Sequence, residues 1–405
     1  MKAHLLIIAD GRSPTALSWI RNIQSLDYGV SLISTFPCEE PAGLLYFQIL
    51  PVAFSRFGRK ANCTAPTNTR VTRPSVLKRA LHRMSPLFQQ LRYTLGPLSL
   101  RTYKPAYLAF LDKVRPDLVH ALRIPFEGML GSFTPPGLPF ITATWGNDLT
   151  LHARGSRQMR RYTRKCLQRA DGLTSDTQRD VRLAHDWGLA ESAPAFVIPG
   201  SGGVDFEAIQ KAEGFDPANY NLPESGTWVV NPRGLRPGSV HQEVFFKSMP
   251  KVLAKCPETA FLCPGLAGVR QAEIWAAKSE GRARIFLLPR LTQQALWSLL
   301  KKSQVFVSPS SHDGTPNTLL EAMAAGCTPV AGDIESLREW IEPGINGLLV
   351  DPRDPDALAE GILQALDSPG FQAQAAMHNL ALIQTRAAQS ITRPMIDDFY
   401  QRFLQ

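Results

Sequence analysis

The chain has 405 residues, of which 44% are apolar and 20% charged, and its formal net charge is +9. At about 150 residues per domain, this length predicts two or three domains. The composition excludes a disulfide-stapled miniprotein, a collagen-like chain and a disordered chain. The positive charge favours an anionic partner without identifying one.

No targeting segment or membrane span is predicted. The apolar run 5–9 ends at Asp10, so it is shorter than the roughly 7–15 residues of a signal-peptide core. No stretch reaches the ~20 apolar residues of a spanning helix. The six cysteines form no CxxC pair, and thiols so scattered are typical of a reducing compartment. We therefore expect a cytoplasmic protein, either free or peripheral on the inner face of the membrane.

The first half of the chain alternates short apolar runs with helical patterns. A helix is predicted at 17–26, after the first of five strands. Continuous apolar strands separated by helices indicate a parallel sheet covered on both faces. The predicted strands are 5–9, 117–121, 139–144, 172–176 and 195–199.

Residues 199–204 contain three glycines in four positions and are the predicted linker. The alternation then restarts. We predict an α/β protein of two doubly wound, Rossmann-like domains facing each other across a cleft, with ligands beyond the carboxyl ends of the strands. The predicted strands of the second half are 227–230, 260–263, 285–288, 305–308, 328–331 and 347–350.

Basic residues are concentrated in the first half. The window 41–111 has no acidic residue, and a second cluster at 157–165 falls on one face of a helix, opposite Met159, Tyr162, Cys166 and Ala170. Such clusters are either solvated faces or sites for anionic lipid or a lipid-diphosphate acceptor. No nucleic-acid-binding motif accompanies them. The cations are Arg56, Arg59, Lys60, Arg70, Arg73, Lys78, Arg79, Arg83, Arg92, Arg101 and Lys104, then Arg157, Arg160, Arg161, Arg164 and Lys165.

The segment 305–326 runs from a strand through a polar loop into a helix. We expect Thr315 to cap that helix, Pro316 to occupy its first position and Gly326 to end it. The amides of Asn317, Thr318 and Leu319 would then form an anion site suited to a diphosphate.

Two acidic residues flank this predicted anion site. Glu321 shares a helix face with Asn317 and Thr318, so its carboxylate is placed to accept hydrogen bonds from two vicinal hydroxyls, as on a ribose. Asp313 precedes the helix and is placed to address a second sugar. On these grounds alone, an exposed helix residue and a turn former are equally good interpretations of the pair.

The same segment resembles the retaining glycosyltransferases of family 4, the glycosyl transferases group 1, which have the GT-B fold. The resemblance lies in Asp313-x7-Glu321, in the following 322–330 (Ala-Met-Ala-Ala-Gly-Cys-Thr-Pro-Val), and in 343–352 (Pro-Gly-Ile-Asn-Gly-Leu-Leu-Val-Asp-Pro). It covers 225–366 and, more loosely, the first half. It implies an acceptor-binding domain at 1–199, a nucleotide-sugar-binding domain at 200–388 and a C-terminal helix at 389–405. That helix, with its stripe of Met395, Phe399 and Phe403, would cross back to the first domain or stay on the second.

The resemblance also implies roles for individual residues. Glu321 would hold the ribose, and Asp313 would stand where the family has a glutamate that contacts the donor sugar. Arg233 matches the family's arginine, whereas its lysine five residues later is Gly238 here, and Arg236 is the candidate second cation. The remaining donor-binding candidates are Gly314, Thr315, Asn317, Thr318 and Leu319 in the loop, and Gly265 in a base-binding loop.

Evidence from the first half is weaker. Asp148, after Trp145-Gly-Asn, resembles the family's reaction-centre region and is a candidate catalytic residue or a turn former. His120 and Arg123 follow a predicted strand and would point toward the cleft, although a lone histidine there is more often structural. Asp354-Pro-Asp formally reads as a metal-binding DxD, but we expect Asp354 to cap a helix, and we predict no metal site.

We therefore expect a metal-independent transferase that moves a sugar, with retention, from a nucleotide diphosphate-sugar to a glycan or lipid-linked acceptor in polysaccharide or envelope glycan synthesis. No cofactor is expected, because the nucleotide-sugar is a substrate, and UDP is favoured over GDP. The expected partners are donor, acceptor and an anionic membrane surface, with no nucleic acid. The alternatives are a nucleotide-sugar 2-epimerase and an inactive sugar-nucleotide-binding protein.

Overall fold

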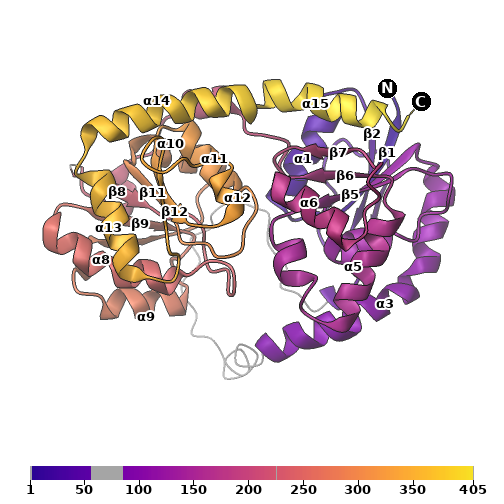
Figure 1. Cartoon of the computed structure of the whole chain (residues 1–405), viewed down its shortest axis with the longest axis horizontal. Coiled ribbons are helices and arrows are strands. Elements are labelled where there is room, and N and C mark those ends of the chain that lie inside the picture. The colour runs from indigo at the N-terminus through magenta and orange to yellow at the C-terminus, as the bar shows by residue number, and fades with distance from the viewer. Residues whose placement is uncertain (1, 56–84, 225, 405) are drawn as a thin grey trace. The chain divides into compact units, whose positions relative to one another are not determined.

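A computed structural model describes residues 2–55, 85–224 and 226–404, with only the backbone at 85–89. The chain divides into two compact units (Figure 1). The first is Met1–Gly203 together with Thr392–Gln405, and the second is Val204–Ile391. The division after Gly203 falls within the glycine-rich segment predicted as a linker, four residues beyond the expected boundary. Gly202 and Gly203 both adopt left-handed backbone angles there, which glycine adopts at little cost.

The first unit contains one parallel sheet of seven strands. Its strand order is β3-β2-β1-β4-β5-β6-β7, so the order reverses between β1 and β4. The sequence patterns missed β2 and β3. The strands are β1 (His4–Ala9), β2 (Gly29–Ser34), β3 (Phe47–Ile49), β4 (Leu118–Ala121), β5 (Phe140–Thr144), β6 (Gly172–Ser175) and β7 (Ala195–Val197).

Helices cover both faces of this sheet. One face packs against α3, α4, α5 and α6, and the other against α1 and the C-terminal α15. The segment at the C-terminus thus belongs to the core of the first unit. The helices are α1 (Pro14–Gln24), α3 (Ser85–Val114), α4 (Met129–Gly131), α5 (Arg157–Arg169), α6 (Gln178–Trp187) and α15 (Gln389–Gln401).

The second unit contains a parallel sheet of six strands in the order β10-β9-β8-β11-β12-β13, which reverses between β8 and β11. All six strands lie within one residue of their predicted bounds. The expected α/β fold of two doubly wound units is therefore confirmed. The strands are β8 (Trp228–Val230), β9 (Ala260–Pro264), β10 (Ile285–Leu288), β11 (Val305–Ser308), β12 (Thr328–Gly332) and β13 (Leu348–Val350).

One face of the second sheet packs against α7, α10, α11, α12 and α14, and the other against α8, α9 and α13. Asp354 caps α13 with Pro355 at its first position, as expected. Gly326, at φ +87°, follows the end of α11. The helices are α7 (Phe206–Gln210), α8 (Gln242–Lys255), α9 (Arg270–Lys278), α10 (Gln293–Lys302), α11 (Asn317–Ala324), α12 (Glu335–Arg338), α13 (Pro355–Leu366) and α14 (Pro369–Arg386).

The expected two-sided character of α5 is confirmed. Met159, Tyr162, Cys166 and Ala170 are buried, and the five cations of its basic face are exposed. Of the cations in the 41–111 window, Arg92, Arg101 and Lys104 lie on α3. The other eight, Arg56, Arg59, Lys60, Arg70, Arg73, Lys78, Arg79 and Arg83, lie outside the described residues.

Candidate functional site

Several of the predicted donor-site residues lie in two loops that leave adjacent strands of the second sheet. Asn231–Gly238 follows β8, and Pro309–Pro316 follows β11. Because β8 and β11 are neighbours at the point where the strand order reverses, their carboxyl ends open a crevice that α/β proteins commonly use for ligands. The residues singled out from the sequence thus lie at this edge of the sheet.

Arg233 connects the two loops. One of its terminal nitrogens, Nη2, donates to Oδ2 of Asp313, and Nη1 donates to the Thr318 hydroxyl at 3.1 Å. The Arg233 side chain is only 3% exposed, and its Nε has no hydrogen-bond partner. A buried guanidinium with one carboxylate partner and an unused donor is a cation held ready for a further anion.

The loop conformation around Asp313 is fixed by short-range bonds. Its Oδ2 also accepts from the Ser310 hydroxyl at 3.2 Å, and its Oδ1 accepts from the Gly314 amide at 3.2 Å. Its backbone carbonyl accepts from the Ser336 hydroxyl at 2.8 Å. The carboxylate therefore has a defined position before any ligand is bound.

The start of α11 differs from the prediction. The helix begins at Asn317, and Pro316 occupies the capping position without a side-chain hydrogen bond. Thr315 does not cap, because its hydroxyl accepts a bond from the Trp340 indole at 2.8 Å. The Leu319 amide donates to the Pro316 carbonyl, so it is not available to a ligand as expected. Asn317 and Thr318 remain half-exposed at the helix N-terminus.

Glu321 lies one turn into α11 and is 8% exposed. Its Oε1 accepts from the Gln293 side chain at 3.2 Å. Burial raises the pKa of Glu321, an effect that the neighbouring Trp297 and Gln293 partly offset. The indole nitrogen of Trp297 is close enough to act on this carboxylate, but it forms no well-aligned hydrogen bond with any described residue. A desolvated carboxylate with few donors gains from the hydroxyl groups of a ligand.

Arg236 and Gly265 are two further predicted donor-site residues. Arg236 is exposed, and its carbonyl accepts the amides of Ser239 and Val240. Gly238 has φ +78°, a conformation that a lysine rarely adopts. Gly265 follows β9, and its amide donates to the carbonyls of Leu288 and Pro289, so this amide is already engaged within the protein.

The first unit has a cavity of about 460 Å³. It lies beyond the carboxyl ends of β1 and β4, where that sheet reverses its strand order, so it is the counterpart of the crevice in the second unit. Aromatic and charged side chains dominate its wall. The lining residues are Ala9, Asp10, Ser13, Phe36, Arg92, Tyr93, Leu122, Arg123, Pro125, Phe126, Glu127, Trp145 and His152.

Asp148 lies behind this wall and is fully buried. Its carboxylate accepts from Arg123 Nη2 at 2.6 Å and Nε at 3.1 Å, and from the amides of Ile124 and Trp145 at 3.2 Å. Burial opposes the charge on Arg123, but Asp148 more than compensates and leaves the pKa of Arg123 raised. With these four donors, Asp148 is placed to orient Arg123 rather than to reach a substrate.

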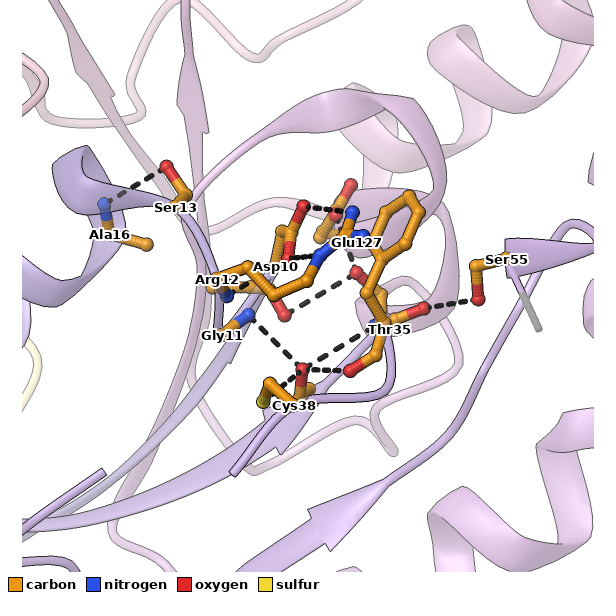
Figure 2. Close-up of polar contacts among 12 residues, drawn as sticks. Asp10, Gly11, Arg12, Ser13, Ala16, Thr35, Cys38, Ser55 and Glu127 are labelled. Carbon is orange, nitrogen blue, oxygen red and sulfur yellow. Dashed lines mark hydrogen bonds and ion pairs between the residues drawn. The ribbon is translucent and has the colours of Figure 1, made fainter. Parts of the chain in front are cut away.

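Glu127 is the acid of the cavity wall that the sequence patterns missed. It is 4% exposed, and its Oε1 accepts from the Thr35 hydroxyl at 2.7 Å, while Asp10 pairs with Arg12 beside it (Figure 2). Burial raises the pKa of Glu127 to about 7, against the opposing effect of Arg123. The only sequence signal was its place in a loop after β4.

Of two histidines in the first unit, one lines the cavity and the other is buried in the core. His120 does not reach the cavity. It is fully buried, and its Nδ1 bonds to the Tyr400 hydroxyl at 2.8 Å, so it is a core residue. His152, which the patterns did not single out, lines the cavity and bonds to the Tyr93 hydroxyl at 2.5 Å. Burial and Arg123 lower its pKa to about 4, so it is neutral at physiological pH.

Within 2–55, 85–224 and 226–404, no group of three or more His, Cys, Asp or Glu residues is arranged to hold a metal ion. Over the same ranges, no helix has the length and apolar character that crossing a membrane requires.

Comparison with known proteins identifies the second unit most clearly. Residues 234–368 match the family model of glycosyl transferases group 1. An uncharacterized glycosyltransferase of Methanocaldococcus jannaschii, MJ1607, is 30% identical over 131 residues, or 32% of this chain and 33% of that protein. The phosphatidyl-myo-inositol mannosyltransferase of Mycobacterium tuberculosis is 27% identical over 192 residues, or 46% and 49%. The chain thus spans a third to a half of these relatives.

Solved structures match nearly the whole chain. Sucrose-phosphate synthase of Thermosynechococcus elongatus has a TM-score of 0.70 at 15% identity, covering 98% of each chain. Anabaena Alr3699/HepE in complex with UDP-glucose has a TM-score of 0.68 at 14% identity, covering 99% of this chain and 100% of that one. At these identities the likeness establishes a common fold, the GT-B fold of glycosyltransferases.

Proposed function

We propose that the protein is a retaining glycosyltransferase of family 4 that moves a sugar from a nucleotide diphosphate-sugar to a glycan or lipid-linked acceptor. The observation that carries this proposal is the network of Arg233, Asp313 and Thr318 at the reversal point of the second sheet, with buried Glu321 one turn along α11. The match of 234–368 to glycosyl transferases group 1 supports it.

Each group then has a chemical role. Arg233 offers its positive charge to the diphosphate, the N-terminus of α11 adds partial positive charge, and Asp313 accepts from hydroxyls of the donor sugar. Glu321 accepts from the ribose hydroxyls. These groups are already in position before the substrate binds, so little reorganisation is needed as the diphosphate acquires charge.

The reaction that we propose proceeds on one face of the sugar. The bond from the anomeric carbon to the diphosphate oxygen breaks, and a bond from the same carbon to the acceptor oxygen forms on the face that the diphosphate leaves. The acceptor hydroxyl proton passes to the departing phosphate oxygen. No metal or cofactor takes part, and the anomeric configuration is kept.

The donor is identified by testing nucleotides directly. We propose a UDP-sugar, although a mannosyltransferase of Corynebacterium glutamicum that is 27% identical over 135 residues is named as GDP-mannose-dependent. Calorimetric titration with UDP, GDP and ADP, followed by assays with the sugars of the nucleotide that binds, distinguishes these donors. Proton NMR of the product reports its anomeric configuration.

Each outcome of these assays has a clear meaning. Turnover with a retained configuration supports the proposal. Binding without turnover of any donor identifies the inactive sugar-nucleotide-binding protein, and a changed sugar on the unreacted nucleotide identifies an epimerase. Failure of folded protein to bind any nucleotide contradicts all three.

We also propose that one face of the first unit binds an anionic membrane, where a lipid-linked acceptor would lie. Helices α3 and α5 cover the same face of the first sheet, so their exposed sides point away from it together. The α5 side carries five exposed cations. The α3 side carries Leu91, Leu95 and Leu98, which are 47, 42 and 40% exposed and recur at helical spacing. Cations beside apolar side chains suit the headgroup and acyl layers of an anionic bilayer.

A further inference from the structure

The arginines in and beside the cavity of the first unit are not equivalent. Arg123 is bonded to buried Asp148 at 2.6 Å, and Arg12 is bonded to Asp10 at 2.9 Å. Each of these two cations therefore has a carboxylate of its own. Arg92 lines the cavity, and no carboxylate among the described residues forms an ion pair with it.

Arg92 is held by aromatic rings instead. Its guanidinium carbon lies 4.6 Å from the ring centre of Phe126 and 5.4 Å from that of Phe36. These contacts attract the charge but accept none of its N–H donors in the plane of the group. Within the part of the chain that the structure describes, the buried Nε atom has no hydrogen-bond partner, and burial lowers the pKa of Arg92.

The nearby carboxyl of Glu127 offsets the charge of Arg92 only in part. Glu127 shares the cavity wall, but its Oε1 is bonded to Thr35. Burial raises the pKa of Glu127 to about 7, so a substantial fraction is uncharged at neutral pH. Because Asp10 and Asp148 are paired with Arg12 and Arg123, the described carboxylates around the cavity leave the charge of Arg92 incompletely balanced. A planar guanidinium matches the two oxygens of a carboxylate or phosphate.

We propose that this cavity is an oxyanion subsite of the acceptor, in which Arg92 binds a carboxylate or phosphate carried by the acceptor sugar. The inference rests on the proposed transferase function and narrows its acceptor to an acidic or phosphorylated class. The cavity volume of about 460 Å³ falls within the ~300–1,000 Å³ of small-molecule sites. Trp145 and Tyr93 in its wall offer flat apolar surfaces to a sugar ring.

The decisive variant is Arg92→Met, which keeps an unbranched apolar stem against Phe36 and Phe126 and removes the charge. The matched control is Arg21→Met, on the exposed side of α1. Calorimetry measures the binding of glucuronate, glucose 6-phosphate and glucose to each protein. We expect the wild type and the control to bind the two anionic sugars more tightly than glucose. Arg92→Met should lose that preference, by about 10- to 100-fold in Kd.

A second pair of measurements separates the sources of a phosphate. Phosphatidylcholine vesicles with and without phosphatidic acid present the group on a lipid, whereas glucose 6-phosphate presents it in solution. A loss on Arg92→Met in the vesicle arm alone assigns the subsite to a lipid phosphate, and a loss in the soluble arm assigns it to a free sugar. An anion preference that survives Arg92→Met, or its absence from the wild type in both arms, overturns the proposal.

Folding and donor binding are controlled in the same samples. If Arg92 only braces the two phenylalanines, Arg92→Met lowers the melting temperature and leaves the anion preference intact, which also overturns the proposal. Arg92→Lys keeps the charge without the fork and should retain part of the preference. Nucleotide binding by the second unit should be the same in all variants. If no sugar transfer is found, the transferase proposal fails. The binding data still test whether Arg92 forms an oxyanion subsite.

Discussion

The guanidinium of Arg233, after β8, donates to the carboxylate of Asp313, after β11, and so joins the two loops at the reversal point of the second sheet. The pair is almost fully buried on the arginine side, at 3% exposure, and more open on the aspartate side, at 13%. A ligand that approaches this edge meets the carboxylate together with the charge that lies behind it.

Replacing Arg233 should therefore lower the rate of sugar transfer more than it lowers the stability of the fold. For Arg233→Met we expect kcat to fall by about 10²- to 10³-fold, the usual loss when one group that stabilises transition-state charge is removed. Because Asp313 is left without its cation, we also expect a modest fall in melting temperature. Steady-state sugar transfer is the measurement, and Arg284→Met, which breaks an exposed pair with Glu258, is the control. Equal kcat in the two variants would contradict the role.

Glu321→Gln should have opposite effects on stability and binding. Burial raises the pKa of Glu321, so a neutral amide of the same shape should raise the melting temperature of the nucleotide-free protein at pH 8. Nucleotide affinity should fall about tenfold, because charge-assisted bonds to the ribose are lost. Thermal unfolding and calorimetry test both. The matched control, Glu273→Gln on the exposed side of α9, should change neither, and a stabilised variant with full affinity would rule out ribose binding.

Glu127 predicts a pH dependence of stability in the first unit. A carboxyl whose pKa is about 7 in the folded protein and ordinary in the unfolded one binds more protons when folded. Its contribution is therefore fully present below about pH 4 and is lost as the pH rises to 7. Those pKa values correspond to a loss on the order of 3 kcal/mol. Urea unfolding of wild type and Glu127→Gln between pH 5 and 8 measures it. If the free energies of unfolding of the two proteins depended on pH in the same way, Glu127 would not have the raised pKa assigned to it.

The membrane-binding face of α3 and α5 makes a prediction about charge. Arg160→Glu with Arg164→Glu should weaken binding to phosphatidylglycerol vesicles by roughly 30-fold or more, since each cation contributes ~1 kcal/mol near an anionic surface. Replacing Leu91, Leu95 and Leu98 by serine should weaken it further. Vesicle co-sedimentation is the readout, and Arg270→Glu with Lys278→Glu on exposed α9 is the charge-matched control. Equal losses in both double variants would point to net charge rather than to this face.

Tyr400 ties α15 to the core of the first unit. Its hydroxyl accepts from the Trp19 indole at 2.9 Å and so has its own hydrogen to donate to Nδ1 of His120 at 2.8 Å. This arrangement agrees with a neutral ring, since burial lowers the pKa of His120 to about 3. Tyr400→Phe should destabilise the first unit by about 1–3 kcal/mol, because both buried partners lose a bond. Hydrogen exchange resolved by unit should show faster exchange in β1 and β4 and unchanged β8–β11.

The sequence was most informative where structure is local. The strands of the second unit are short apolar runs between helices, and Asp354 with Pro355 marks a helix start on chemistry that needs no neighbour. β2 carries serines at 31 and 34, and β3 has only three residues, so neither shows a clear apolar run. Thr315 was assigned wrongly because a distant indole, that of Trp340, takes its hydroxyl.

The candidate sites divide in the same way. Asp313 and Glu321 follow from one segment of the sequence, and Arg233 follows from the family resemblance. Arg92, Glu127 and His152 come from three separate elements, and only the topology of the first sheet brings them to one cavity. No spacing between these residues in the sequence predicts that they line one cavity. His120, which the strand pattern placed beside a cleft, is instead covered by α15.

The contribution of residues 392–404 to the first unit has a consequence for biosynthesis. A ribosome delivers β1 to β7 early, yet Ile396, Phe399 and Tyr400, which cover one face of that sheet, emerge only after the whole second unit. Domains usually fold in the order in which they are synthesised. Here, however, all residues of the second unit are synthesised before the last residues of the first unit. During translation of some two hundred residues, the apolar surface around Trp19 and Ile20 awaits its covering helix, and a holding chaperone would find its binding site there.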